Sequence, residues 1–271
     1  MCLNRTFFGV SLGLFLIAPF VDATSKRGAA YNNPATATLL SNTGAVSWAY
    51  NWGMAEIITL PLGVEFVPML GRADFGGWDT SVEHARVRGS AYILGFNEPD
   101  MTSQANLSPS VAAGYYMKYI TPYQRDFKLI SPAVTSSTSA GMGLQWLDSF
   151  MTACALCGIS GIAVHWYGDS ADDFKSFVEE AISFAKAHEL SEVWVTEFAL
   201  NIDISGVTDQ ASSATFIQDV TSWLDKQTFV ARYSYFMCAE GYLLSGGVLN
   251  RAGKAYTVAP ALSSNPCNLI G

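Results

Sequence analysis

Residues 91–100 read Ala-Tyr-Ile-Leu-Gly-Phe-Asn-Glu-Pro-Asp, and residues 193–198 read Val-Trp-Val-Thr-Glu-Phe. Both are short apolar runs of the kind found in strands that are buried on both faces, as in a parallel sheet. Each run places a glutamate, Glu98 or Glu197, where the apolar residues stop. A charged group at the edge of a core is unfavourable unless a site uses it. The two runs therefore predict a parallel sheet with a carboxylate at two of its strand ends.

Runs of this kind recur along the chain and alternate with segments of helical periodicity. The predicted strands are residues 28–32, 46–52, 65–70, 92–97, 128–134, 161–167, 192–198 and 232–238, and the clearest predicted helices are residues 108–124, 144–156, 170–188 and 209–225. Eight strands that alternate with crossover segments predict a single-domain α/β protein with the (β/α)8 TIM-barrel fold. Residues 39–42 and 79–87 are short or poorly amphipathic, so we expect some early crossover helices to be reduced.

The barrel prediction gives the two glutamates a common location. Active sites of such barrels lie at the carboxyl ends of the strands. Glu98 ends the fourth predicted strand and Glu197 the seventh, so both should rise from the same rim. Cleavage of a glycosidic bond requires, at a minimum, two carboxyl groups that converge on it, and these two strands could provide them.

The amino-terminal residues have the features of a secretory signal peptide. Arg5 supplies a positive charge, residues 7–17 are apolar, and small or apolar residues precede a cleavage point after Ala23. We therefore expect residues 1–23 to be removed and residues 24–271 to form the barrel domain of a secreted, extracellular protein; association with the cell wall is compatible with this expectation. The alternative is that the apolar segment is retained as an anchor.

The composition favours an uncharged partner. Charged residues make up 14% of the chain, below the ~25% of average soluble proteins, and the net charge is −8. An acidic chain repels nucleic acid and anionic membranes, whereas neutral glycans suit it. We expect a monomer that needs no cofactor and binds neither nucleic acid nor, after signal cleavage, a membrane.

The cysteine pattern predicts disulfide chemistry rather than a metal site. Cleavage after Ala23 would leave four cysteines, and an even count in a secreted chain suggests disulfides. No second Cys or His pair at ligand spacing accompanies the Cys-x-x-Cys motif, so we expect no zinc. The pairing among Cys154, Cys157, Cys238 and Cys267 is left open.

Five ordered motifs carry a family resemblance. They are residues 94–100 (Leu-Gly-Phe-Asn-Glu-Pro-Asp), 163–168 (Ala-Val-His-Trp-Tyr-Gly), 194–199 (Trp-Val-Thr-Glu-Phe-Ala), 46–53 (Val-Ser-Trp-Ala-Tyr-Asn-Trp-Gly) and 66–70 (Phe-Val-Pro-Met-Leu). The chain resembles glycoside hydrolase family 128, the Asl1-like glycosyl hydrolases of clan A, over nearly all of its mature length.

The resemblance implies hydrolysis of β-1,3-glucan with retention of configuration. It makes Glu98 the general acid/base and Glu197 the nucleophile, although the residues alone give no reason to prefer that order. It also implies that Asn97 hydrogen-bonds the 2-hydroxyl of the sugar, a contact that strengthens in the transition state. The alternative role of Asn97 is to cap the turn before Pro99.

Further side chains are candidates for substrate binding. His165 and Tyr167 lie two apart and share a strand face, so Tyr167 could hydrogen-bond Glu197 and His165 could line the subsite; the alternative for His165 is a core histidine. Phe236 stands at the eighth strand, where many clan A enzymes have a tryptophan. Aromatic rings at or just beyond strand ends complete the set: Tyr50, Trp52, Trp78 and Trp166, with Trp52 and Trp78 preferred because each lies near a glycine-containing strand-to-loop junction.

Two other functions stay compatible with these residues. One is a non-catalytic β-glucan-binding cell-wall protein on the same barrel. The other is a glycosidase that cleaves a β-1,4 or β-1,6 linkage instead.

Overall fold

A parallel α/β arrangement organises the computed structural model, which describes residues 25–258 except 58 and 208. One sheet has three parallel strands and the other has five, both in sequence order, and a small antiparallel hairpin follows them. The strands are β1 (Gly28–Ala30), β2 (Trp48–Tyr50), β3 (Glu65–Phe66), β4 (Tyr92–Ile93), β5 (Lys128–Val134), β6 (Ile159–Gly168), β7 (Glu192–Leu200), β8 (Val230–Tyr235), β9 (Leu244–Ser245) and β10 (Val248–Leu249). Each of the eight predicted strands coincides with one of β1–β8.

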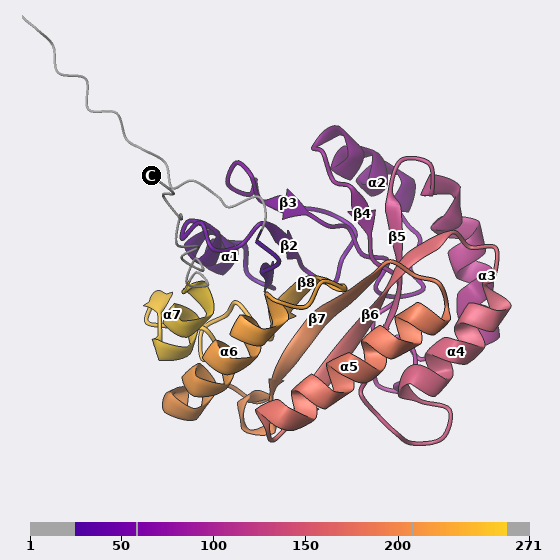
Figure 1. Cartoon of the computed structure of the whole chain (residues 1–271). Helices are drawn as coiled ribbons and strands as arrows, with labels where there is room; N and C mark the ends of the chain where they lie inside the picture. Colours follow the sequence, from indigo (N-terminus) through magenta and orange to yellow (C-terminus); the bar gives the residue numbers. More distant parts are fainter. Residues whose placement is uncertain (1–24, 58, 208, 259–271) are drawn as a thin grey trace, which may run out of the picture.

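Isolated bridges join the two parallel sheets at both of their edges. Arg27 pairs with Tyr233 beside β1 and β8, and Met69 pairs with Leu94 between β3 and β4. The sheets therefore curl toward one another, and the predicted α/β fold with parallel strands is confirmed (Figure 1). The ladders of β3 and β4 are only two residues long. Beyond β4 the chain packs tightly on the segment of β5, because a Cβ added to Gly95 would lie 2.6 Å from the backbone nitrogen of Pro132.

The helices cover the outside of the strands. They are α1 (Pro34–Ser41), α2 (Trp78–Val87), α3 (Pro109–Tyr119), α4 (Gly143–Ala153), α5 (Ala171–Ala187), α6 (Gln210–Leu224) and α7 (Arg251–Thr257), with 3-10 turns η1 (Thr121–Tyr123) and η2 (Asn201–Asp203). All four clearly predicted helices are present. Among the early crossovers, α1 is short and no helix occurs between β2 and β3 in the described residues, whereas residues 79–87, also expected to be reduced, form most of the ten-residue helix α2.

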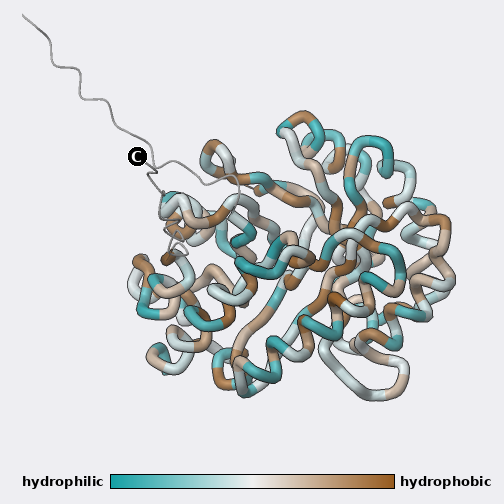
Figure 2. Tube along the Cα trace, viewed as in Figure 1, coloured by the Kyte–Doolittle hydropathy of each residue, from teal (hydrophilic) through white to brown (hydrophobic). Residues whose placement is uncertain are grey.

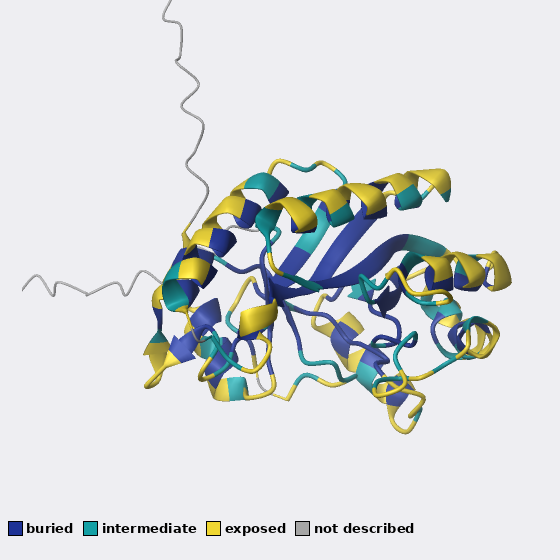
Figure 3. Cartoon of the chain, turned by 90° about the horizontal axis from the view of Figure 1, so that it is seen from below, coloured by how far each residue is buried: buried dark blue, intermediate teal, exposed yellow. Residues whose placement is uncertain are grey.

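Helix α5 shows why these segments fold as they do. Ser170 accepts a hydrogen bond from the backbone N–H of Asp173 and so caps the amino end, where acidic residues are also favoured. Phe174 and Val178 are fully buried against the strands, while the opposite face is polar. Figures 2 and 3 show this alternation along the outer helices, around strands that are almost entirely buried.

The cysteines that the structure describes form one disulfide and one buried thiol. Cys154 and Cys157 are bonded at the end of α4, with Cα atoms 5.2 Å apart. Cys238 is free, and burial raises the pKa of its thiol to about 12, so it is an unreactive core residue. Cys267 and the predicted signal peptide lie outside the described residues. Within the described part of the chain, no helix has the length and apolar character needed to cross a membrane.

A guanidinium–aromatic stack fills the amino ends of the strands. The Cζ atom of Arg232 lies 4.5 Å from the ring centre of Tyr92, 4.8 Å from that of Trp194 and 5.6 Å from that of Trp48. Its Nη2 also donates to the carboxylate of Glu65, which in turn accepts from the backbone N–H of Ala91. A charged plane between aromatic faces combines cation–π attraction with an ion pair.

Replacing Arg232 with alanine should lower the free energy of unfolding by about 3 kcal/mol, because Glu65 would keep a partly buried charge without its partner. Arg232→Lys should lose less, since the charge remains but the planar stack is gone. Chemical denaturation measures both. The matched control is Arg86→Ala, which breaks an exposed Arg–Glu pair on α2 and should change stability little. Equal losses for Arg232→Ala and Arg86→Ala would contradict the role of the stack.

Candidate active site

Glu98 lies five residues after the end of β4 and is held by the backbone of β5. Its N–H donates to the carbonyl of Ala133 (2.8 Å), directly after the bridge between Asn97 and Ala133. Its φ angle is +41°, in the left-handed region that non-glycine residues rarely adopt. Strain of this kind persists where the surroundings dictate the conformation. The side chain is 6% exposed and points across the carboxyl ends of the strands.

Glu197 lies within β7 and accepts hydrogen bonds at both carboxylate oxygens. Trp52 Nε1 donates to Oε1 at 2.6 Å, and the Tyr167 hydroxyl donates to Oε2 at 2.5 Å. The side chain is 5% exposed. Both donors are neutral, so they orient this carboxylate without forming an ion pair with it.

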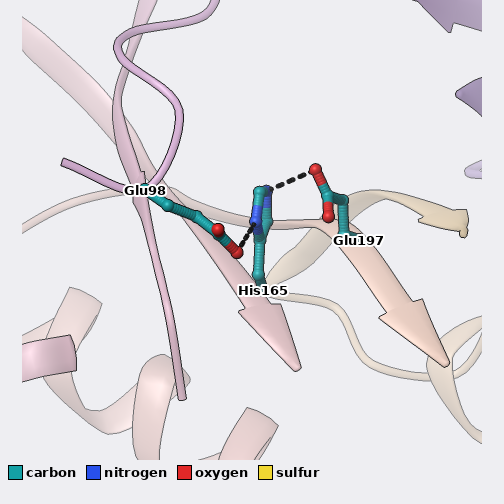
Figure 4. Close-up of side chains that lie close together, drawn as sticks. All are labelled: Glu98, His165 and Glu197. Atoms are coloured by element: carbon teal, nitrogen blue, oxygen red, sulfur yellow. Dashed lines mark hydrogen bonds and ion pairs between the residues drawn. The ribbon is translucent and has the colours of Figure 1, made fainter. Parts of the chain in front are cut away.

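His165 lies between the two glutamates. Its Nδ1 is 2.9 Å from Oε1 of Glu98, and its Nε2 is 2.9 Å from the hydroxyl of Thr196 and 3.6 Å from Oε1 of Glu197. The pairing of β6 with β7 sets His165 opposite Glu197, which explains the contact. Figure 4 shows the two carboxylates approaching opposite nitrogens of the imidazole. One carboxylate oxygen of each glutamate and one imidazole nitrogen all lie within 4.8 Å of one another.

This geometry does not suit a single metal ion. Two carboxylates and an imidazole are a possible ligand set. However, the glutamates face different nitrogens of His165, and one ion cannot lie on both lone pairs at once. The oxygens of Glu197 are also already bonded to Trp52 and Tyr167.

The carboxylates open into a cavity of about 920 Å³ at the carboxyl ends of the strands. Of the predicted site residues, the structure brings Glu98, Glu197, Asn97, His165, Tyr167, Trp52 and Phe236 together at its wall. The ring of Phe236 makes edge contacts with Trp52 (6.0 Å between centres) and Tyr167 (5.7 Å). These three rings form an aromatic surface around Glu197. Phe236 therefore lies at the cavity wall, as predicted for the aromatic residue of the eighth strand.

Asn97 has an unused hydrogen-bonding atom at this wall. Its Nδ2 makes a weak 3.4 Å contact with Oε1 of Gln104, while its buried Oδ1 has no partner. An unsatisfied buried polar atom is unfavourable in a free protein. A ligand hydroxyl that donates to Oδ1 would remove this deficit.

Two predicted aromatic residues lie away from the cavity. Trp166 alternates with His165 and Tyr167 along β6, so it points to the helix side and packs on Phe174 and Phe216. Trp78 begins α2, is 1% exposed, and donates from Nε1 to the carbonyl of Tyr119. The prediction that these two residues bind substrate is therefore wrong in position. Both lie near a strand end, but their side chains pack between other elements of the fold instead of facing the cavity.

Tyr50 supports the site from below rather than lining it. It is fully buried inside the sheet, and its hydroxyl donates to the backbone carbonyl of Thr196 at 2.8 Å. Its ring also packs on Trp52, with 5.2 Å between the centres. Tyr50 therefore helps to position the strand and the ring that hold Glu197.

The remaining cavity residues come from loops that the sequence analysis did not select. They include Asn32, Arg72, Asp74, Met101, Gln104, Thr135, Ser137, Met142 and Ile204. Most follow a strand by several residues, and no periodicity fixes where such side chains point. The only available signal was their position after the carboxyl end of a predicted strand.

The two glutamates shift the pKa of the imidazole upward. Burial lowers the pKa of His165, but the charge of Glu197, together with the hydrogen bond and the charge of Glu98, outweighs it and raises the pKa above its ordinary value. When it is protonated, the imidazole reduces the repulsion between neighbouring carboxylates. His165 can thereby allow two acidic groups to share one buried site.

A pH-dependent stability follows from the raised pKa of His165. The contribution is present in full below the unfolded-state pKa of about 6.5 and is lost as the pH rises through the folded-state value. The difference in unfolding free energy between the wild type and His165→Asn should thus shrink with rising pH, by about 1.4 kcal/mol per unit of the shift. Denaturation from pH 5.5 to 9 measures it, with His84→Asn, on the exposed face of α2, as control. A difference that grows with pH would contradict the assignment.

Two buried carboxylates near one another, at the carboxyl ends of parallel strands and beside an aromatic surface, define a site of the glycoside hydrolase class. The chain matches the family model described as "Glycosyl hydrolase catalytic core" over residues 28–256. The protein belongs to this glycosyl hydrolase family.

Comparison with solved structures leads to the same class of protein. The chain is similar to a curdlan-specific exo-β-1,3-glucanase of glycoside hydrolase family 128 (subgroup III) from Blastomyces gilchristii, with 39% identity, a TM-score of 0.79, and coverage of 86% of this chain and 98% of that one. A subgroup I endo-β-1,3-glucanase from Amycolatopsis mediterranei, solved with laminaritriose, is 30% identical, with a TM-score of 0.72 and coverage of 86% and 98%.

A curated relative is the alkali-sensitive linkage protein 1 of Schizosaccharomyces pombe. It is 29% identical over an alignment of 226 residues, and the match covers 78% of this chain and 40% of the relative. The chain therefore spans about two fifths of the length of that protein. The resemblance to family 128 and to the Asl1-like proteins, inferred from five motifs, is confirmed.

Proposed function

We propose that this protein is a secreted, monomeric, retaining β-1,3-glucanase built on a (β/α)8 barrel, with Glu98 as acid/base and Glu197 as nucleophile. The close approach of the two carboxylates carries the proposal. Retaining enzymes hold the two groups about 5–5.5 Å apart, whereas inverting enzymes leave about 6.5–9.5 Å for a water molecule. Oxygens of Glu98 and Glu197 within 4.8 Å of one another favour retention. The bridges at both sheet edges favour closure of the barrel.

The hydrogen bonds support the order of the two roles. Glu197 accepts from Trp52 and Tyr167, which fix both of its oxygens in place, as attack on the anomeric carbon requires. Glu98 has an imidazole as its partner, a group that can share and return a proton. An acid/base must gain and lose a proton in every cycle, so this pairing suits Glu98. The sequence did not distinguish the two roles.

The reaction then proceeds in two displacements. Oε of Glu197 attacks the anomeric carbon while Glu98 gives its proton to the departing glycosidic oxygen, so the carbon–oxygen bond breaks and a glycosyl ester forms. Glu98, now ionised, takes a proton from water, whose oxygen attacks the same carbon and releases Glu197. Asn97 Oδ1 is placed to accept from the sugar 2-hydroxyl in both steps.

The comparisons and the cavity support β-1,3-glucan as substrate. The Blastomyces and Amycolatopsis proteins are named as β-1,3-glucanases, and the second was solved with laminaritriose. A cavity of about 920 Å³, walled on one side by Trp52, Tyr167 and Phe236, has room for a ligand well above the size of one sugar ring. Secretion rests on the predicted leader; a protein that stays inside the cell with residues 1–23 attached would argue against it.

The test is incubation of the purified protein with laminarin and curdlan, with the configuration of the first product followed by NMR. The expected result is release of β-anomeric product from β-1,3-linked glucans only. Initial α-anomeric product would exclude retention. Cleavage of β-1,4- or β-1,6-glucans in a parallel panel would reassign the linkage, and binding of laminarin without turnover would favour a non-catalytic wall protein.

A further inference from the structure

Asp100 links three segments of the cavity wall. Its Oδ2 accepts from the Thr135 hydroxyl (2.6 Å) and from the Gly143 N–H (2.9 Å), and the carboxylate also receives the Thr135 N–H. Asp100 lies two residues after Glu98, Thr135 lies directly after β5, and Gly143 begins α4. One half-buried carboxylate thus ties the catalytic loop to a strand end and to a helix start.

Helix α4 depends on this carboxylate for its amino end. Its N-cap residue, Met142, makes no side-chain capping bond, and its first turn carries no acidic residue. The first N–H groups of a helix need an acceptor, and a negative charge is favourable there. Asp100 supplies both from a neighbouring loop. Gly143 has a φ of +56° and sits so close to Ser137 that an added Cβ would lie 2.2 Å from its carbonyl oxygen.

The segment held in this way forms part of the cavity. Thr135, Ser136, Ser137 and Met142 all line it, as do Met101 and Gln104 on the loop that carries Asp100. Within the segment, the Ser137 N–H donates to the Thr135 hydroxyl. The position of Ser137 therefore depends on the position of Thr135. The charge of Asp100 also helps to raise the pKa of His165.

We propose that Asp100 is a positioning residue, which fixes residues 135–143 as the wall of the substrate cavity beside the acid/base Glu98. The expected effect on catalysis rests on the proposed glucanase function. The set of hydrogen bonds that Asp100 accepts from Thr135 and Gly143, called the Asp100 clamp below, does not depend on that function. Because Asp100 reaches the substrate only through the loop it holds, its loss should act mainly on substrate binding.

The test compares wild type, Asp100→Asn and Asp100→Ala. The control is Asp172→Asn, which makes the same chemical change in the first turn of α5, away from the cavity. Amide hydrogen exchange should become about tenfold or more faster at Thr135 and Gly143 in both Asp100 variants. The KM for laminarihexaose should rise by roughly tenfold, with a smaller change in kcat. The Asp172→Asn control should match the wild type in both measurements.

Several outcomes would overturn the proposal. Unchanged exchange at Thr135 and Gly143 would remove the clamp. Faster exchange with unchanged KM, or a lowered melting temperature alone, would leave Asp100 a purely structural residue. Asp100→Asn keeps the side-chain shape, so it carries the test if Asp100→Ala does not fold. If the wild type cleaves no glucan, the proposed function fails, and hydrogen exchange with calorimetric binding of laminarihexaose still decides the role of Asp100.

Discussion

Glu197→Gln should reduce kcat on laminarin by on the order of 10⁴-fold or more, because the amide cannot form the glycosyl ester on which the reaction depends. The change is nearly isosteric. Trp52 and Tyr167 remain to hold the side chain, so the fold and the cavity should be preserved. Reducing-sugar release measures the loss, and calorimetry with laminarihexaose should show that binding persists.

The control for this variant lies on the same strand. Glu192 begins β7 at the opposite end, where it pairs with Lys128 and accepts from Trp194 Nε1. Glu192→Gln is expected to affect stability but to leave kcat near the wild-type value. A Glu197→Gln enzyme that keeps a tenth of its activity would rule out this residue as the nucleophile.

The second large effect concerns the acid/base. Glu98→Ala should lower kcat on laminarin by roughly 10²–10⁴-fold, since proton transfer to the leaving oxygen is lost. With an aryl β-glucan oligosaccharide, the rate of the first step should fall less, because the aryl leaving group can depart without a proton. Added azide should then restore turnover by attacking the glycosyl ester of Glu197 and yielding a β-glycosyl azide.

The stereochemistry of the azide product distinguishes the two glutamates. A β-azide from Glu98→Ala means that the ester on Glu197 formed first and was displaced with a second inversion. An α-azide from that variant would reverse the roles proposed for Glu98 and Glu197. Asn97→Ala, which leaves both carboxylates in place, should give no azide product.

The central part of the site could be predicted from sequence because strand periodicity determines it. Counting the predicted strands placed Glu98 and Glu197 on one rim, although β4 ends at Ile93, before Glu98, and β7 continues past Glu197 to Leu200. The alternation along β6 likewise placed His165 and Tyr167 on a common face. The same alternation excludes Trp166, so applying it consistently would have removed that candidate.

Other features depend on distances that a linear pattern does not contain. The roles of the two glutamates rest on which side chains reach them, and Trp52 reaches Glu197 across 145 positions of the chain. Arg72, Gln104 and Thr135 enter the cavity from loops with no period. The close approach of Gly95 to Pro132 is likewise visible only in the folded backbone.

The stack of Arg232 on Tyr92, Trp48 and Trp194 has a consequence for how this protein can change over evolutionary time. It anchors the strands at the end opposite to the glutamates, and none of its residues reaches the cavity. Substitutions that reshape the loops above the strands can therefore accumulate without weakening this anchor. Selection can therefore act on the cavity loops and on the stability of the fold independently of one another.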